Sequence, residues 1–392
     1  MRIGIFSECY LPTLNGVVIS IETFRLELEK RGHEIFVFAP ATNGYVDRDN
    51  KHVFRYPSIQ WPGQKEYPLA LPIFSTTITK KIKDLKLDII HAQHLFTMGN
   101  LGLRIARQLD IPIVYTYHTL IAEYTHYVPA LTGISRKALI SLSRDFCNKC
   151  DQIVTPSPSM AKILKSYGVK KPIEAIPTGI YILRLQNHLP GKIIHTQWDI
   201  PENRKILLYL SRIAKEKNID FLLKAMKLLI FKRQKKFGHC DVHLLMVGGG
   251  PELLHYQQLA RKMGIEEYVT FTGMIKYEVA TKYYGAAKIF VFPSVTETQG
   301  IVVTEAMAAG TPVVAVNKMG PSDLIVNGED GYLTGLNISE FSGKIEKLLD
   351  DEKLYNKMSQ KAKINAENFS SETCSIKLEN VYEQTIIRYR TK

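Results

Sequence analysis

Two carboxylates flank the predicted start of one helix in the second half of the sequence. Glu297 lies in the loop after an apolar, strand-like run, and Glu305 lies inside the helix predicted for residues 301–309. Carboxylates accept hydrogen bonds from sugar hydroxyls, and the N–H groups of a first helical turn hold phosphate oxygens. The first-turn groups here belong to Gly300, Ile301 and Val302. The segment therefore predicts a nucleotide-sugar site, although by itself it also fits a helix cap at Glu297 and a solvated Glu305.

Basic and glycine-rich loops follow two earlier strand-like runs. Arg212 and Lys217 come after residues 205–210, where a guanidinium can bind phosphate in a fork and a lysine adds a mobile charge. The Gly248–Gly250 turn, with Gly249 at its centre, precedes another predicted helix and would let the backbone approach a ligand closely. Taken singly, these features also fit surface charge and a tight turn.

Two further motifs have spacings that are typical of metal or redox sites. Asp47-Arg48-Asp49 resembles a metal-binding carboxylate pair, but no further ligand is evident beside it, so we expect no metal there. Cys147 and Cys150 have the spacing of a zinc or redox pair without a second pair, which favours coincidence. Five scattered cysteines predict no disulfide framework, and the cytosol is the expected compartment.

Composition limits the class of protein and its partners. The 392 residues predict about two domains, at roughly 100–200 residues each, and 45% hydrophobic with 23% charged residues is ordinary for globular proteins. The net charge of +13 predicts an anionic partner: nucleic acid, an anionic membrane or a phosphorylated substrate. No run approaches the roughly 18 apolar residues of a membrane span, and the N-terminus lacks the apolar core of a signal peptide. Any membrane contact is therefore predicted to be peripheral.

Short apolar runs alternate with helical patterns along the chain, which predicts an α/β protein with doubly wound parallel sheets. The expected strands are residues 2–6, 34–39, 89–91, 113–117, 152–155 and 174–176, then 205–210, 243–247, 268–271, 289–292 and 313–316. A polar segment at 181–203 predicts an interdomain linker. We expect domains at 1–182 and 183–370, with a C-terminal helix in 371–392 that returns to the first domain. Ligands should bind at the carboxyl ends of the strands.

In their order and spacing over nearly the whole chain, these features resemble the retaining glycosyltransferases of family 4. The residues that carry the resemblance are Glu297, Glu305, Arg212, Lys217, the Gly248–Gly250 turn, Phe271-Thr272-Gly273 and the Asn15-Gly16 loop. The resemblance implies the GT-B architecture, in which two Rossmann-like doubly wound domains face each other across a cleft. It also implies a hexosyltransferase that needs no metal or other cofactor.

The resemblance assigns roles position by position. Glu297 would contact the hydroxyls of the donor sugar and Glu305 those of the ribose, while Arg212 and Lys217 would hold the diphosphate. The backbone at Met274 and Ile275 would contact the base, and Gly16 would lie near the phosphates. His118 would lie near the reacting sugar and the acceptor, so the implied catalytic group is His118, Glu297, Arg212 and Lys217. On its own, His118 also fits a histidine that lines a cleft and is satisfied by backbone.

A narrower similarity is to the bacterial diacylglycerol glucosyltransferases. It is carried most by Tyr124-Thr125-His126-Tyr127-Val128 and by Thr296-Glu297-Thr298-Gln299-Gly300. It implies transfer of glucose from UDP-glucose to the 3-hydroxyl of 1,2-diacylglycerol, with α retention, at the inner face of the cell membrane. The partners would be a nucleotide sugar, diacylglycerol and an anionic lipid surface, with no nucleic acid. Where the family has Asn-Gly-Ile-Asp, this chain has Thr178-Gly179-Ile180-Tyr181.

The acceptor side of the prediction depends on residues 76–87 and 124–127. Lys80, Lys81 and Lys83 lie among apolar residues in a predicted amphipathic helix, which can lie on an anionic surface. The same pattern fits a solvated helix whose apolar face is in the core. Tyr124, His126 and Tyr127 would contact the acceptor by resemblance. The alternatives are another acceptor, such as a phosphatidylinositol-like lipid, a lipopolysaccharide core sugar or a soluble sugar, and a non-catalytic basic binding module on this scaffold.

Overall fold

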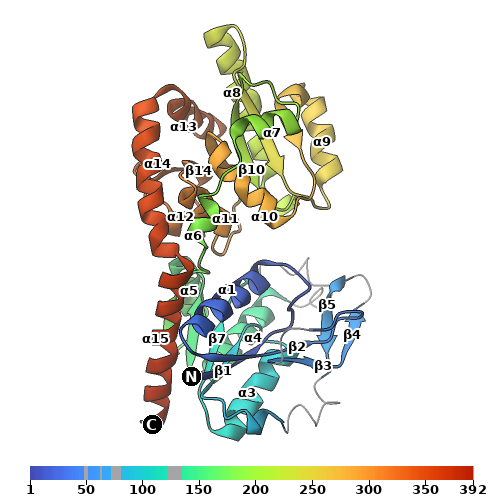
Figure 1. The fold of residues 1–392 in the computed structure, drawn as a ribbon, viewed down its shortest axis with the longest axis vertical. Helices are drawn as coiled ribbons and strands as arrows, with labels where there is room; N and C mark the ends of the chain where they lie inside the picture. Colours follow the sequence, from blue (N-terminus) through green and yellow to red (C-terminus); the bar gives the residue numbers. More distant parts are fainter. Residues whose placement is uncertain (48–51, 62–63, 72–80, 122–134, 392) are drawn as a thin grey trace. The chain divides into compact units, whose positions relative to one another are not determined.

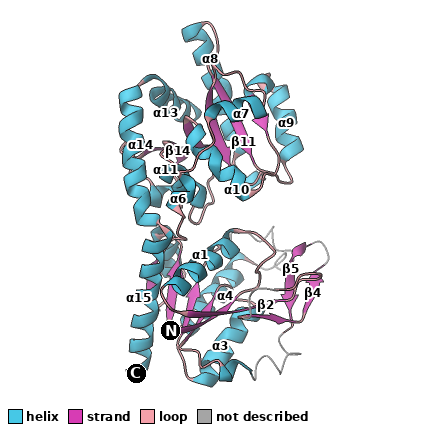
Figure 2. Cartoon of the chain, in the orientation of Figure 1, coloured by secondary structure: helices cyan, strands magenta, loops and turns pink. Residues whose placement is uncertain are grey.

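The computed structural model describes residues 1–47, 52–61, 64–71, 81–121 and 135–391 (Figure 1). The chain forms two compact units. The first combines Met1–Gly179 with Ser371–Lys392, and the second is Ile180–Ser370. Helices surround the strands of each unit, as Figure 2 shows.

The first unit is built on a parallel sheet. In the described residues it has seven strands in the order β3-β2-β1-β6-β7-β8-β9. They are β1 (Arg2–Phe6), β2 (Glu34–Pro40), β3 (Val53–Tyr56), β6 (Ile89–Ala92), β7 (Ile113–Thr116), β8 (Gln152–Thr155) and β9 (Ile173–Ala175). All of β6, β7 and β8 is buried, as expected for parallel strands covered on both faces. A separate antiparallel hairpin pairs β4 (Ser58–Trp61) with β5 (Gln64–Ala70).

The helices of the first unit include one from the far end of the chain. Those with both ends among the described residues are α1 (Gly16–Lys30), α3 (Thr97–Leu109), α4 (Arg136–Lys149), α5 (Pro158–Ser166) and α15 (Ser371–Arg390). Helix α15 lies beside α1 (Figure 1), and its Leu378 and Tyr382 join the same core as Ile3 and Val37. Glu379 of α15 also pairs with Arg31, at 2.5 Å.

The second unit contains a parallel sheet with the order β12-β11-β10-β13-β14-β15 in the described residues. Its strands are β10 (Lys205–Leu210), β11 (Val242–Val247), β12 (Val269–Phe271), β13 (Ile289–Phe292), β14 (Val313–Val316) and β15 (Gly331–Thr334). The α-helices are α6 (Ile182–Leu185), α7 (Gly191–Gln197), α8 (Ile219–Phe237), α9 (Leu253–Lys262), α10 (Tyr277–Ala280), α11 (Ile301–Ala308), α12 (Pro321–Leu324), α13 (Ile338–Asp350) and α14 (Glu352–Ala366). Short 3₁₀ turns are η5 (Lys215–Lys217), η6 (Glu266–Tyr268), η7 (Thr281–Ala286) and η8 (Glu367–Phe369).

Successive side chains along the strands of the second unit lie alternately in two hydrophobic cores, one on each face of the sheet. Leu207 of β10 and Val291 of β13 lie in the core that α8, α9 and α13 cover. Leu208 and Phe290 lie in the other core, with residues of α7, η7 and α11. Strands β10 and β13 therefore have helices on both faces of the sheet, which explains their continuous apolar runs in the sequence.

The prediction of a linker at residues 181–203 is wrong. This segment forms α6 and α7 within the second unit, and its Leu185, Ile194 and Ile200 are buried in the core there. Both helices are short, so their few apolar residues show no helical period in the sequence. Strands β3 and β15, of four residues each, were also not predicted.

Each sheet has one point at which the strand order reverses. In the first unit the chain moves outward from β1 to β2 and β3, then returns to β6 on the other side of β1. In the second unit it moves from β10 to β11 and β12, then returns to β13. Open α/β sheets bind ligands beyond the carboxyl ends of the strands that flank such a reversal. The candidate ligand sites are therefore the carboxyl ends of β1 and β6 in the first unit and those of β10 and β13 in the second.

Candidate functional site

The carboxyl ends of β10 and β13 bring the predicted donor residues together. These two strands pair in parallel, with Leu207 opposite Ile289 and Leu208 opposite Phe290, so the loops that follow them emerge at one edge. The loop after β10 carries Arg212 and, in η5, Lys217. The loop after β13 carries Glu297.

Lys217 and Glu297 form an ion pair across these loops. The Lys217 ammonium donates to Oε1 of Glu297, and the Ser294 hydroxyl donates to the same oxygen at 3.0 Å. The side chains of Lys217 and Glu297 are 15% and 16% exposed, so both are reachable from solvent. Asn218 ties the two loops together by donating to the carbonyl of Pro293 at 3.1 Å. A cation and a carboxylate are thus held side by side at the strand ends, ready to bind an anionic and a hydroxylated group.

Arg212 supplies a second cation to this edge. Its side chain is 55% exposed, and Nη2 donates to Oε1 of Glu216 at 2.6 Å. The backbone around it is fixed, because the buried Tyr209 donates its hydroxyl to the Arg212 carbonyl at 3.1 Å. The guanidinium is thus partly exposed on a backbone that is held in place.

The N-terminus of α11 begins next to Glu297. Gly300 is the N-cap and has a φ of 87°, a left-handed conformation that glycine adopts without strain. The N–H groups of the first turn, at Ile301 and Val302, have no intrahelical partner and carry the positive end of the helix dipole. This terminus can hold phosphate oxygens, as the sequence predicted.

Glu305 lies inside the protein rather than in solvent, which excludes the interpretation of a solvated helical residue. It is 1% exposed, and both carboxylate oxygens accept hydrogen bonds, Oε2 from Tyr284 at 2.7 Å and Oε1 from Tyr277. Burial raises the pKa of Glu305, and the two phenol hydroxyls partly counteract that rise. Neither tyrosine was predicted as a site residue. They are seven residues apart, a spacing that places side chains on one face of a helix, but the spacing does not show that this face contacts Glu305.

The glycine turn after β11 lies against the loop after β10. A Cβ on Gly248 would clash with the carbonyl of Ser211, and the Gly248 N–H donates to Gly273 at 3.1 Å. Gly249 lies beside Met274, which is 85% exposed, whereas Ile275 packs on the core. The loop assigned to the base therefore presents backbone and one exposed side chain.

His118 and Gly16, the other predicted residues, belong to the first unit. His118 follows β7 and its Nε2 contacts Oε1 of Gln93 at 2.7 Å. Burial, with nearby His94 and His91, holds the pKa of His118 well below its ordinary value, so the ring is neutral at pH 7. Gly16 opens α1 behind Asn15, whose side chain accepts from the N–H groups of the first turn, and a Cβ on Gly16 would meet open space.

The edge of β1 and β6 in the first unit holds further polar groups. The N–H of Glu8 donates to Nδ1 of His94 at 3.2 Å. The Glu8 carboxylate accepts from Thr97 and from the Met98 N–H at the start of α3. His91, between Tyr382 and Thr116 at 2.6 Å each, is a buried structural residue. Glu8 and Gln93 were not predicted as site residues, although both follow predicted strands.

The residues assigned to the acceptor and the membrane are only partly described. Lys80, Tyr124, His126 and Tyr127 lie outside the described residues. Lys81 and Lys83 are exposed, but Ile82 and Leu87 on the same segment are buried. In the described part of this segment, the apolar side chains thus lie in the core.

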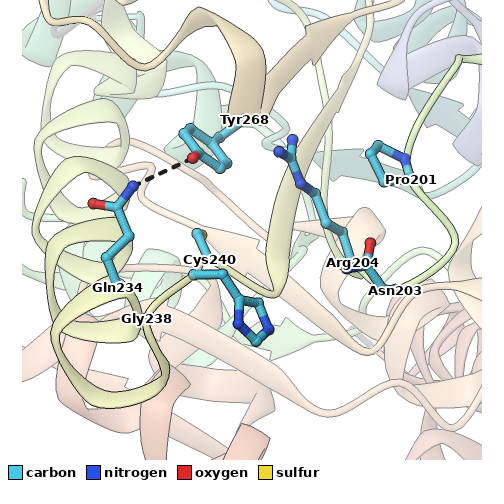
Figure 3. Close-up of a pocket in the computed structure, with 8 residues that line it drawn as sticks. Pro201, Asn203, Arg204, Gln234, Gly238, Cys240 and Tyr268 are labelled. Atoms are coloured by element: carbon cyan, nitrogen blue, oxygen red, sulfur yellow. Dashed lines mark hydrogen bonds between the residues drawn. The ribbon is translucent and has the colours of Figure 1, made fainter.

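An open hollow of about 440 Å³ lies at the other end of the second sheet (Figure 3). It is lined by Pro201, Asn203, Arg204, Gln234, Gly238, His239, Cys240 and Tyr268. Gln234 donates to the hydroxyl of Tyr268 at 3.3 Å across it. None of the predicted site residues lines this hollow, which lies at the amino ends of β10 and β11.

The other motifs singled out in the sequence have structural roles where they are described. Asp47 binds Arg55 at 2.8 Å, and Arg48 and Asp49 lie outside the described residues. Cys147 and Cys150 are buried, unbridged thiols. Across the described ranges, no group of three or more His, Cys, Asp or Glu side chains could hold a metal ion. In the same ranges, no helix is long and apolar enough to cross a membrane.

Comparison with known proteins decides the family. The profile of "Glycosyltransferase Family 4" matches residues 14–182, and that of "Glycosyl transferases group 1" matches residues 192–365. An alpha-monoglucosyldiacylglycerol synthase of Streptococcus pneumoniae is 36% identical over 321 residues, which are 80% of this chain and 71% of that protein. The chain belongs to the family 4 glycosyltransferases. This glycosyltransferase is a hexosyltransferase with the GT-B fold, as the resemblance implied.

Further relatives and solved structures agree with this assignment. The glycosyltransferase is 27% identical to the alpha-monoglucosyldiacylglycerol synthase of Acholeplasma laidlawii, over 100% of this chain and 99% of that protein. It is 28% identical to a GDP-mannose-dependent alpha-mannosyltransferase of Corynebacterium glutamicum, over 90% and 81% of the two chains. Its fold matches a sucrose-phosphate synthase of Thermosynechococcus elongatus with a TM-score of 0.79 at 21% identity, covering 99% of this chain and 100% of that one. It also matches HepE of Anabaena, solved with UDP-glucose, with a TM-score of 0.76 at 18% identity, covering 98% and 100%.

Proposed function

We propose that this glycosyltransferase transfers glucose from UDP-glucose to the 3-hydroxyl of 1,2-diacylglycerol, with retention of the α configuration. The observation that carries the proposal is the similarity to two alpha-monoglucosyldiacylglycerol synthases, one of them matched along its whole length. We place the enzyme on the cytoplasmic face of the cell membrane as a peripheral protein. The nucleotide sugar and the lipid are its substrates, and nucleic acid is not a partner.

The donor half of the reaction uses the edge of β10 and β13. Departure of UDP from the sugar leaves negative charge on the diphosphate, which Arg212, Lys217 and the N-terminus of α11 are arranged to neutralise. Because these groups supply the positive charge, we propose that the reaction needs no metal ion. Glu297 binds the hydroxyls of the sugar and Glu305 those of the ribose.

The first unit contributes a neutral imidazole to the proposed reaction. At pH 7 the His118 ring carries no charge, because its pKa lies well below the ordinary value. A neutral ring can donate a hydrogen bond to a sugar hydroxyl or accept one from it. It does so without adding charge to the diphosphate site. We propose that His118 positions the reacting sugar, with Gly16 leaving space near the phosphates.

The lipid surface is contacted through exposed lysines rather than through an inserted apolar face. Lys81 and Lys83 are exposed while Ile82 between them is buried, so the described part of this segment offers charge to a bilayer. Each basic residue near an anionic surface contributes on the order of 1 kcal/mol. Reversing both charges, as Lys81→Glu with Lys83→Glu, should weaken binding to phosphatidylglycerol vesicles by at least about tenfold.

The matched control for this test is the pair Lys224→Glu and Lys227→Glu, two exposed lysines of α8 in the second unit. Vesicle flotation should show a smaller loss for the control pair than for the pair at 81 and 83. If the wild-type protein did not bind anionic vesicles at all, the acceptor would be a soluble molecule rather than diacylglycerol.

A second donor deserves a direct comparison because one relative is named as a GDP-mannose-dependent mannosyltransferase. Wild-type protein should transfer label from UDP-glucose, and not from GDP-mannose, into lipid. Glu297→Gln keeps the size of the side chain and removes its charge, so transfer should fall by at least about a hundredfold, the cost of losing a charged hydrogen-bond partner at the reacting sugar. Unchanged transfer by that variant would contradict the role of Glu297 at the donor sugar, whereas no transfer by the wild-type protein either would favour a non-catalytic binding module.

A further inference from the structure

The Glu305 carboxylate accepts hydrogen bonds from two tyrosines of unequal exposure. Tyr284 is 0% exposed and lies edge-on to Phe290, with ring centroids 5.5 Å apart, inside the core of the second unit. Tyr277 is 43% exposed and is the first residue of α10, a helix of four residues. Only Tyr277 can move away from Glu305 without opening the core.

The hydroxyl of Tyr277 satisfies a buried charge. Glu305 is 1% exposed, and its Oε1 accepts from Tyr277 while Oε2 accepts from Tyr284. A buried carboxylate that loses a donor without replacement is strongly destabilised. Any ligand that displaces Tyr277 must therefore bring a hydroxyl of its own.

We infer that the hydroxyl of Tyr277 occupies, in the free protein, the place on Glu305 that a ribose hydroxyl of the donor nucleotide takes on binding. This inference rests on the proposed donor site. A phenol and a ribose hydroxyl each donate one hydrogen bond, so the exchange keeps the carboxylate satisfied. Tyr277 follows directly on the loop of Met274 and Ile275, which the family resemblance assigns to the base, so a nucleotide bound there brings its ribose toward Tyr277.

The exchange makes Tyr277 a residue that determines specificity for ribonucleotides. A nucleotide with ribose hydroxyls replaces the bond that it breaks, whereas a dideoxyribose has nothing to offer Glu305 and leaves Tyr277 in place. Removing the Tyr277 hydroxyl should therefore strengthen the binding of UDP but leave the binding of 2′,3′-dideoxy-UDP nearly unchanged.

The test is calorimetric titration of the full-length protein with these two nucleotides. Tyr277→Phe keeps the ring and removes the competing hydroxyl, so UDP should bind about threefold to tenfold more tightly, the usual worth of one hydrogen bond. The affinity for 2′,3′-dideoxy-UDP should stay within about twofold of the wild-type value. Tyr283→Phe is the matched control, because the Tyr283 hydroxyl contacts Gln197 and Trp198 rather than Glu305, and it should change neither affinity.

The possible outcomes separate the exchange from the donor site on which it rests. Unchanged or weaker binding of UDP to Tyr277→Phe would overturn the exchange, because the hydroxyl would then be neutral or favourable to the ligand. An equal gain for both nucleotides would also overturn it, since Tyr277 would merely obstruct the site. Failure of wild-type protein to bind UDP at all would overturn the proposed donor site, and the exchange with it.

Discussion

Charged side chains at the carboxyl ends of β10 and β13 neutralise one another in the free protein. Lys217 is paired with Glu297 and Arg212 with Glu216, so each cation proposed to bind the diphosphate already has a carboxylate partner. In the proposed donor site, an incoming diphosphate would compete for the cations and leave Glu297 available to sugar hydroxyls. Donor binding would then change the partners of both Lys217 and Glu297.

Lys217→Ala should weaken UDP binding by about tenfold to a hundredfold, because a charge-assisted hydrogen bond contributes about 1.5–3 kcal/mol. The unpaired Glu297 would also repel the diphosphate. Lys215→Ala is the matched control, since Lys215 is an exposed lysine of the same turn, η5, and its loss changes the net charge equally. Calorimetric titration of both variants with UDP checks the prediction. Equal weakening by the two substitutions would mean that general charge, and not the contact of Lys217, governs affinity.

The charged residues of this site could be predicted from the sequence, but several of the contacts between residues could not. Glu297, Arg212 and Lys217 follow strands directly, so the rule that loops meet at the carboxyl edge was enough to bring them together. The contact of Tyr277 with Glu305 joins residues 28 apart and depends on how α10 folds over α11. No local period encodes such a contact, and the pairing of His118 with Gln93 escaped prediction for the same reason.

At the scale of elements, Arg233 joins three parts of the second unit. Its side chain is 1% exposed and lies in the penultimate turn of α8. It binds Asp241, just before β11, through two hydrogen bonds of 2.7 Å, and Asp350, at the end of α13, at 2.5 Å. Burial raises the pKa values of both aspartates, but the bonds to Arg233, with those of Lys236 to Asp350 and of Lys205 to Asp241, hold them below their ordinary range.

Arg233→Ala should lower the free energy of unfolding of the second unit by about 2–4 kcal/mol, because it leaves two carboxylates without their buried partner. Urea unfolding followed by the fluorescence of Trp198, in a Trp61→Phe background, reports on this unit alone. The loss should shrink as the pH falls through the depressed pKa values of Asp241 and Asp350, since protonated carboxyls no longer need the arginine. Lys235→Ala, at an exposed position of the same helix, should cost no more than about 0.5 kcal/mol. A loss of that small size for Arg233→Ala would contradict the assigned role.

The elements with a continuous apolar run were the most predictable. The apolar strands β1, β10 and β13 were predicted at their observed bounds. The short helices α6 and α7 were mistaken for a linker because three buried side chains, Leu185, Ile194 and Ile200, are too few to show a period. Tertiary packing, rather than local pattern, decides their place in the second unit.

At the scale of the whole molecule, the two units should respond differently to acid. In the first unit, burial lowers the pKa of His91 to about 3 and that of His94 to about 4, and His118 is also lowered well below its ordinary value. The unfolded chain takes up these protons near pH 6.5, whereas the folded unit does not, so stability falls as the pH drops below 6.5. Glu8 acts in the opposite sense because its pKa is raised, but one carboxyl offsets only part of the effect of three imidazoles.

By pH 5, His91 and His94 should each cost the first unit about 2 kcal/mol of stability. Hydrogen exchange at pH 7.5 and pH 5, corrected for the intrinsic rates, should show a larger loss of protection in β1, β6 and β7 than in β13 and β14. The second unit has one strongly shifted imidazole, His243, with a pKa of about 4, and the raised pKa values of Glu305 and Asp330 oppose it. Equal protection of the first unit at both pH values would contradict the buried neutral state of its histidines.

Lipid glycosylation tests the central claim most directly. Purified protein would be incubated with radiolabelled UDP-glucose and mixed micelles of diacylglycerol, with and without phosphatidylglycerol, in the presence of EDTA, and the lipids extracted. We expect label in a monoglucosylated lipid of α configuration, with more label when the anionic lipid is present and no loss of label in EDTA. Release of free glucose without a labelled lipid would contradict diacylglycerol as the acceptor, and no turnover of UDP-glucose at all would contradict the assigned donor.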